Sequence, residues 1–323
     1  MIVDVDARSL SRVRVAASPA SEVLSWLRLA RGGRPHPVLG LPGGAARAAL
    51  AHPDVRLVLQ AVPRLTGYAP DMLTPKPPAG KAVAGLSSQL DLIEATPADA
   101  VRRQLRQVAF PGGRPPAQLR AAADAGVFAR RAANGLHRFW RAALADWWPR
   151  LEVALGREVA ARGALMAGYG IERVLSSLHP RIGWTGRQLR IDKPYQDVCH
   201  LDGAELVLAP SVVNWSTVVA QVCDPMDAVL VYPAGGAGTD LARRAAGGDE
   251  GMLRLVGRSR AAILRDLAVP RTTSELSARH ALSPATVSYH LQALLDACLV
   301  FRTRDGHHVR YRRTDRGDAL LGR

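Results

Sequence analysis

Arginines alternate with other residue types in two neighbouring segments near the end of the chain. Arg302 and Arg304 belong to the first segment, and Arg310 and Arg312 belong to the second. A guanidinium group binds phosphate oxygens through paired N–H donors, so this pattern could hold the backbone of a nucleic acid. Arginines in a hairpin can also be simply solvated. The elements next to these segments therefore decide between phosphate contact and solvation.

Positive charge is concentrated at this end of the chain. The 323 residues carry 43 Lys and Arg, only three of them Lys, against 28 acids, a formal net charge of +15. Residues 251–323 hold thirteen arginines against six acids. An Arg-rich codon bias in a GC-rich genome would spread arginine evenly, whereas a polyanionic partner favours a local excess. The uneven distribution therefore favours DNA binding by the C-terminal residues.

A helix that could read DNA precedes the arginines. The sequence SPATVSYHLQALLDACLV begins with Ser283, a favoured N-cap residue, and Pro284, which suits the first helical position. Apolar residues at helical spacing predict a buried face: Val287, Leu291, Leu294, Leu295 and Cys298. The other face carries small or polar side chains that suit base edges in the major groove: Thr286, Ser288, Tyr289 and Gln292. We expect a recognition helix over residues 283–297.

Helical segments are also predicted before this helix. Residues 253–268 have an apolar stripe, and Thr272 and Thr273 can cap a short helix that carries Leu276. A turn at about 280–282 then leads into the recognition helix. The order of a helix, a turn and a second helix is typical of DNA-binding helix-turn-helix domains.

A basic hairpin is predicted after the recognition helix. Residues 299–313 read as two alternating strands joined by Asp305-Gly306, which favours a tight turn. The alternation predicts one cationic face and one packed face, the latter formed by Phe301, Thr303, Val309 and Tyr311. Such a hairpin is the wing of a winged helix-turn-helix, which we place at residues 252–323.

The predicted DNA contacts come from the short helix, the recognition helix and the wing. His307 and His308 lie at the hairpin tip, where contact with the DNA backbone and plain exposure are both compatible with the sequence. The complete set is Thr273, Ser283, Thr286, Ser288, Tyr289, Gln292, Arg302, Arg304, His307, His308, Arg310 and Arg312.

The segment TTSELSARHALSPATVSYHLQALLDACLVFRTRDGHHVRYRRT resembles the winged helix of the ArsR-like (arsenical-resistance-repressor) transcription factors. Cys298 stands where that family usually has Gly, which affects the end of the recognition helix. The resemblance implies a homodimer that binds a pseudo-palindromic operator and represses transcription until an effector is sensed. Metal-sensing members carry Cys pairs or Asp/His sets, but TTSELSARH has no Cys and His280 has no partner in sequence. We therefore expect neither a metal site nor a cofactor.

The first part of the chain is expected to be mainly helical with a small β region. A capped helix is predicted from Ser18 to about Leu29, and residues 81–109 are helical in composition with an interruption at Thr96-Pro97. Apolar spacing predicts further helix from Leu136 to about Leu178, with a kink or restart at Pro149. Strands are predicted at residues 188–192, 205–209, 212–219 and 228–232. The predicted fold class is therefore α+β, with a winged helix-turn-helix at the C-terminus.

Two domains are expected from the length and from a Gly-rich stretch. Residues 234–251 hold six Gly, a composition typical of a flexible linker. We place an effector or dimerisation domain at residues 1–240, a linker at 241–251 and the DNA-binding domain at 252–323. The motifs RVRVAASPASEVLSWLR, GYAPDMLTPKPP, LHPRIGW and LVYP resemble the N-terminal domain of unknown function that actinobacteria fuse to such winged helices.

An aromatic helix in the first domain suggests two alternatives. His137, Trp140 and Trp147 could line an effector pocket, or they could belong to an ordinary core face. Cys199 and His200 are adjacent strand residues that point to opposite faces, so they are a poor pair for one metal ion. Cys223 reads as a small buried apolar residue.

No recognised catalytic motif occurs, so an enzyme is not expected. The alternative is a ligand-binding or enzymatic first domain whose winged helix serves protein interaction. The first residues lack the pattern of a signal peptide and no long apolar stretch occurs, so we expect no membrane partner and a cytoplasmic protein that joins the nucleoid when bound to DNA.

Overall fold

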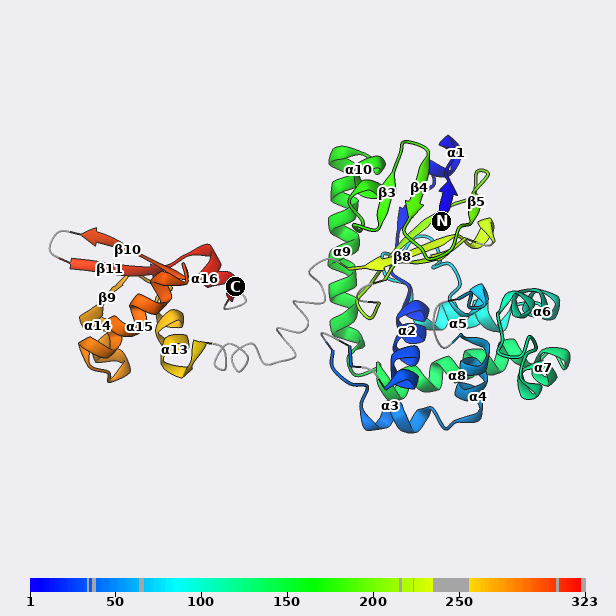
Figure 1. The fold of residues 1–323 in the computed structure, drawn as a ribbon, viewed down its shortest axis with the longest axis horizontal. Coiled ribbons are helices and arrows are strands. Elements are labelled where there is room, and N and C mark those ends of the chain that lie inside the picture. The colour runs from blue at the N-terminus through cyan, green and yellow to red at the C-terminus, as the bar shows by residue number, and fades with distance from the viewer. Residues whose placement is uncertain are drawn as a thin grey trace. The chain divides into compact units, whose positions relative to one another are not determined.

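The computed structural model of the protein describes residues 1–33, 35–36, 39–63, 67–214, 217–222, 224–234, 256–305 and 308–320 (Figure 1). The chain divides into two units, Met1–Gly238 and Thr239–Arg323. The predicted linker at 241–251 lies outside the described residues, as do Cys223 and His307. No helix of the described ranges is long and apolar enough to cross a membrane.

The N-terminal unit is rich in helices, which are labelled in Figure 1. They are α1 (Ala7–Leu10), α2 (Pro19–Gly32), α3 (Gly44–Ala49), α4 (Pro53–Ala61), α5 (Leu86–Glu94), α6 (Ala98–Gln107), α7 (Ala117–Asp124), α8 (Phe128–Ala143), α9 (Trp148–Tyr169) and α10 (Ile171–Ser176). Helix α8 contacts each of the helices α2, α3, α4, α5, α6 and α7. Gly135 allows α8 to approach α4, because a Cβ at this position would lie 2.6 Å from the Asp54 carbonyl oxygen on α4.

Two small sheets complete the N-terminal unit. The first has the strand order β3-β4-β1-β5, formed by β1 (Ile2–Asp4), β3 (Ile182–Trp184), β4 (Gln188–Ile191) and β5 (Val198–His200). The second has the order β2-β6-β8-β7, formed by β2 (Arg14–Val15), β6 (Val207–Ser211), β7 (Val219–Gln221) and β8 (Val229–Pro233). Apolar side chains of both sheets and of α10 share one buried cluster.

The structure corrects some local predictions for this unit and confirms others. Of the strand predicted at 212–219, the described residues 212–214, 217 and 218 are not in a strand, and β7 begins at Val219. The predicted interruption at Thr96-Pro97 is confirmed, since α5 ends at Glu94 and α6 begins at Ala98 with Pro97 as its N-cap residue. A new helix, α9, begins at Trp148 with Pro149 in its first turn, so the predicted restart at Pro149 is confirmed. The α+β fold class is confirmed, but strands β1 and β2 were not predicted, because they are short and pair with residues almost 190 positions away.

The C-terminal unit consists of helices and a three-stranded sheet of order β10-β11-β9. Its elements are α13 (Arg258–Asp266), β9 (Arg271–Thr272), α14 (Thr273–His280), α15 (Pro284–Asp296), β10 (Val300–Asp305), β11 (His308–Arg313) and α16 (Asp315–Leu320). Apolar residues from α13, α14, α15 and β10 form its core. The predicted recognition helix is α15, and the predicted wing is the β10–β11 hairpin.

The register of the wing contradicts one prediction. Phe301 pairs with Arg312, and Arg302 pairs with Tyr311. Directly paired residues project from the same face of a sheet. Each face of the hairpin therefore carries both arginines and apolar side chains, so the predicted division into one packed and one cationic face is wrong. The prediction failed because alternation within each strand does not determine which residues of the two strands lie opposite each other.

Candidate nucleic-acid interface

A capping box begins helix α14. The Thr272 hydroxyl accepts from the Glu275 backbone N–H at 3.2 Å, and the Glu275 carboxylate accepts from the Thr272 N–H at 2.7 Å. This backbone hydrogen bond lowers the pKa of Glu275, helped by the charges of Arg310 and Arg271. Thr273, a predicted DNA contact, is half-buried at the start of the same helix. The box fixes the start of α14.

Asp266 ties the elements of the helix-turn-helix together. Its carboxylate lies 3.0 Å from Arg271 Nε, 2.6 Å from Arg279 Nε and 3.2 Å from His280 Nε2. Burial raises the pKa of Asp266, but the hydrogen bond from Arg279 and the nearby positive charges outweigh burial and lower it overall. His280, which had no partner in the sequence, therefore has one in the fold. The cluster joins the end of α13 to β9 and α14.

The start of α15 is organised by Ser283 and Thr286. The Ser283 hydroxyl accepts from the Thr286 N–H at 3.1 Å and lies 2.8 Å from the Thr286 hydroxyl. Pro284 occupies the first turn, as the sequence predicts. Ser283 and Thr286 were both predicted to contact DNA, and the structure shows that both also stabilise the helix start.

The outer face of α15 presents polar side chains to solvent. Ser288 and Gln292 are exposed, and Tyr289 is 65% exposed. Val287, Leu291 and Leu294 on the opposite face are buried in the core. The Gln292 amide nitrogen donates to Asp296 at 2.8 Å, so a base would compete with this side chain for it. Ser288 and Tyr289 are the more accessible of the predicted contacts.

Arg260 of α13 was not predicted as part of this surface. Its guanidinium lies over the Tyr289 ring, 5.6 Å from the ring centroid, and the Tyr289 and His290 rings are 5.5 Å apart. Burial lowers the pKa of His290, and the charge of Arg260 lowers it further. An arginine stacked on a tyrosine depends on how α13 and α15 pack, which no local spacing in the sequence reveals.

Cys298, where the sequence departs from the ArsR-like pattern, lies two positions after the end of helix α15. Cys298 has φ +56°, in the left-handed region that favours Gly. The Leu299 N–H donates to the Leu294 carbonyl at 2.9 Å and the Cys298 N–H to the Leu295 carbonyl at 2.8 Å, which form a Schellman motif. The helix end therefore keeps the geometry that Gly would provide, with Cys in the strained position.

The wing presents arginines on both faces. Arg302, Arg304 and Arg312 are exposed and Arg310 is half-buried. Arg313, not among the predicted contacts, is buried at the base of the hairpin, where its N–H donates to the Leu267 carbonyl. The His308 backbone belongs to β11, while His307 lies outside the described residues. Arginines on both faces allow phosphate contacts on either side of the wing.

The aromatic residues of the N-terminal unit divide between core and surface. Leu136, Leu144 and Leu151 of the predicted stripe are buried. His137 is exposed and stacks on the half-buried Trp140 at 6.1 Å between ring centroids. Trp147 is 38% exposed beneath the Arg150 guanidinium. One cavity is lined by residues from 1–2 and 180–198, and another by residues from 53–57 and 118–131. Neither of these two cavities is lined by the aromatic residues.

Other candidate residues of the sequence are dispersed. Cys199 packs against the core of the first sheet, and burial raises its thiol pKa, whereas His200 points to Asp4, 3.4 Å away. The two side chains therefore face opposite sides of β5, as predicted. Across the residues that the structure describes, no group of three or more His, Cys, Asp or Glu side chains could hold a metal ion.

The comparison with known proteins agrees with this geometry. A family model described as a helix-turn-helix domain matches residues 258–300, from α13 to the start of β10. No curated protein and no solved structure matched the chain. The C-terminal unit is thus a helix-turn-helix domain of the DNA-binding type, followed by a wing.

Proposed function

We propose that the protein is a transcriptional regulator of the ArsR-like type that represses its target gene as a homodimer. Helix α15 lies in the major groove of a pseudo-palindromic operator, and the wing contacts the flanking backbone. The N-terminal unit supplies the dimer contacts and senses an effector. This role requires no catalytic group and no metal.

The exposure of Ser288 and Tyr289 is the observation that carries this proposal. Both side chains lie on the outer face of α15. Val287, Leu291 and Leu294 on the inner face are buried in the core, whereas Leu295 is half-buried and Cys298, predicted to be buried, is exposed. Ser288 can donate to and accept from base edges, and Tyr289 adds an aromatic ring and a hydroxyl. A helix whose exposed face is polar, and which precedes exposed wing arginines, suits base reading combined with phosphate contact.

The charges near α15 also support binding to a polyanion. Arg302 and Arg312 are exposed on the two strands of the wing. The acids of this unit are partly engaged, because Asp266 binds two arginines and Glu275 closes the capping box. The Asp266 carboxylate is thus held by Arg271 and Arg279, which both lie outside the wing hairpin.

Fluorescence anisotropy of the full chain tests the proposal. DNA from the region upstream of its own gene is compared with a scrambled duplex of equal length at two salt concentrations. We expect tight binding to one duplex, a gap of at least about a thousandfold over scrambled DNA, and a steep salt dependence for both. Equal affinity for the two duplexes, in an operator search that covers the whole upstream region, would count against a regulator and favour a wing used for protein interaction.

Dimerisation is tested separately. Sedimentation of the full chain should give twice the mass of one chain, and the binding stoichiometry should be two chains per duplex. Two half-sites about one helical turn apart should be protected from cleavage. A monomer that binds a single half-site would contradict the homodimer while leaving DNA binding intact.

A further inference from the structure

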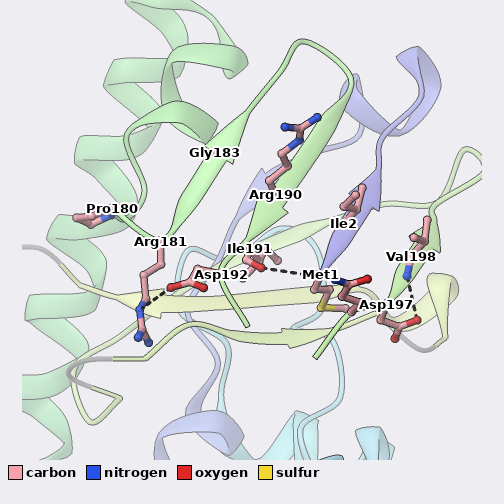
Figure 2. A pocket seen from close by; sticks show the side chains of 11 residues that line it. Met1, Ile2, Pro180, Arg181, Gly183, Arg190, Ile191, Asp192, Asp197 and Val198 are labelled. Atoms are coloured by element: carbon pink, nitrogen blue, oxygen red, sulfur yellow. Dashed lines mark hydrogen bonds and ion pairs between the residues drawn. The ribbon is translucent and has the colours of Figure 1, made fainter. Parts of the chain in front are cut away.

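The first sheet of the N-terminal unit has an open face that holds a cavity of about 670 Å³ (Figure 2). The strand register aligns Gly183 of β3, Arg190 of β4, Ile2 of β1 and Val198 of β5 in one row. Residues paired in this way project from the same face of a sheet. Their neighbours Val3, Leu189 and Ile182 project to the other face and are buried in the core. The cavity therefore has a floor made of one guanidinium and two aliphatic side chains.

Arg190 is the notable residue of this floor. Its side chain is exposed, and it makes no hydrogen bond or ion pair with any part of the chain that the structure describes. Arg181 at the edge of the cavity differs, because its Nε lies 3.5 Å from Asp192 Oδ2 (Figure 2). Arg190 thus retains its N–H donors for a planar acceptor such as a carboxylate.

Gly183 leaves room beside Arg190. A Cβ built at this position would meet only the Cβ of Arg190, 4.0 Å away, and the residue has no left-handed φ that would demand Gly. A larger side chain would therefore fit the backbone but would occupy the space next to the guanidinium.

The rest of the lining restricts the ligand. Val198 is 56% exposed and Ile2 is half-buried, so an apolar group on them would cover surface that now faces water. Asp192 and Asp197 stand at the edge, with the Asp197 carboxylate accepting from the Val198 N–H at 2.9 Å. Asp192 is paired with Arg181, and Asp197 lies in the same lining as Arg190 and the Met1 amino group, which donates to the Ile191 carbonyl at 3.2 Å. The two carboxylates offset part of the positive charge of the lining, which disfavours a multiply charged anion such as phosphate.

We propose that this cavity binds a small monocarboxylic acid with an apolar body. The carboxylate pairs with Arg190, and the body lies across Ile2 and Val198. Strands are spaced about 4.8 Å apart, so the row from Arg190 to Val198 extends about 10 Å and suits an aliphatic acid of medium length. The proposal stands on the geometry of this sheet and does not depend on DNA binding.

Ligand-observed saturation-transfer NMR of the full chain with octanoate tests this site. Octanol, which lacks the carboxylate, and inorganic phosphate, which lacks the apolar body, serve as comparison probes. We expect octanoate to bind at millimolar concentration or better, octanol at least about tenfold more weakly, and phosphate not at all. Absence of octanoate binding, or equal binding of octanol, would overturn the proposal.

Variants place the binding at this cavity. Arg190→Gln removes the cation and Gly183→Val fills the adjacent space, so each should weaken octanoate binding at least about tenfold. Arg173→Gln, on the exposed side of α10 and outside the cavity lining, should bind as the wild type does. Circular dichroism checks that each variant is folded. If Gly183→Val does not fold, octanoate binding by Arg190→Gln alone decides whether the site is at this cavity. Octanoate binding unchanged in Arg190→Gln would overturn the assignment. Binding to DNA is measured on the same variants and separates this result from the proposed function.

Discussion

The Arg260 guanidinium lies over the ring of Tyr289, 5.6 Å from its centroid, and thereby joins helix α13 to the outer face of α15. Tyr289 is otherwise 65% exposed, so this contact restricts a side chain that would be free to rotate. A side chain that is already oriented loses less entropy when it binds. If Tyr289 contacts DNA as proposed, we expect Arg260 to aid recognition by positioning it.

Replacing Arg260 should affect both DNA binding and a nearby titration. We expect Arg260→Gln to weaken operator binding about two- to fivefold, the value of an exposed cation–π contact. The pKa of His290 should rise, because the repulsion from Arg260 is removed while its burial remains. NMR titration of His290 and anisotropy measure the two effects. Arg258→Gln, exposed on the same helix, is the control, and an unchanged His290 pKa would contradict the contact.

Ser288 is the sharpest test of base reading by α15. Ser288→Ala should reduce the free-energy gap between operator and scrambled DNA by about 1–3 kcal/mol, because a donor and acceptor at a base edge is lost. Gln292→Ala should reduce the gap less, since its amide nitrogen is already bound to Asp296. Competition anisotropy with both duplexes measures the gap. An unchanged gap in both variants would show that another element reads the bases.

The wing arginines should act on affinity without changing sequence preference. Arg302→Ala and Arg312→Ala should each weaken binding to operator and scrambled DNA alike, and each should flatten the salt slope by about one unit. Anisotropy at four or more salt concentrations gives the slope. Arg173→Ala in the N-terminal unit is the matched loss of one exposed arginine and should leave the slope unchanged. A selective loss of operator binding would instead assign base contacts to the wing.

The C-terminal helices could be predicted because their signals are local. Ser283 and Pro284 define the start of α15, and Thr272 with Glu275 defines the start of α14 within three residues of sequence. The hairpin was also predicted, but the prediction of its two faces was wrong. Those depend on the pairing of Phe301 with Arg312, which alternation within one strand does not specify.

The remaining features depend on contacts between distant residues. Strand β1 is three residues long and pairs with Arg190 and Val198, so its own sequence carries little evidence of a strand. The cavity on that sheet consequently could not be predicted either. His280 and Asp266 are brought together by the packing of α13 against α14, which a linear search for partners overlooks.

Cys298 predicts a variant that stabilises the C-terminal unit. Its φ of +56° is strained for a side chain with a Cβ and free for Gly. Cys298→Gly should therefore raise the free energy of unfolding by about 1 kcal/mol, despite the greater freedom of Gly in the unfolded chain. Ala297→Gly, at the preceding residue with φ −78°, should lower it and is the control. Urea unfolding measures both, and stabilisation by the Ala297 variant alone would contradict the role of φ.

Glu22 predicts a pH dependence of stability in the N-terminal unit. Its carboxylate is fully buried on α2 and accepts from the N–H groups of Val212 at 3.1 Å and Val213 at 2.9 Å. Burial raises the pKa of Glu22 to about 7 from an ordinary value of 4.5, because the hydrogen bonds from Ser211, Val213 and Val212 only partly offset the lost hydration.

The sign of the effect follows from proton binding. Between pH 4.5 and about 7 the folded chain keeps a proton on Glu22 that the unfolded chain releases, so stability falls as pH rises through this range and levels off above it. The fall is of order 3 kcal/mol, at 1.36 kcal/mol for each pKa unit. The side chain of Glu22→Gln cannot titrate, so this variant lacks the pH dependence of stability that Glu22 causes. Burial also raises the pKa values of Asp71 and Asp227, but these residues change the stability of both proteins equally. Urea unfolding from pH 4.5 to 8 should therefore show wild type losing stability relative to Glu22→Gln as pH rises. The exposed Glu152→Gln should follow wild type throughout, and parallel curves for Glu22→Gln and wild type would mean that Glu22 ionises normally in the fold.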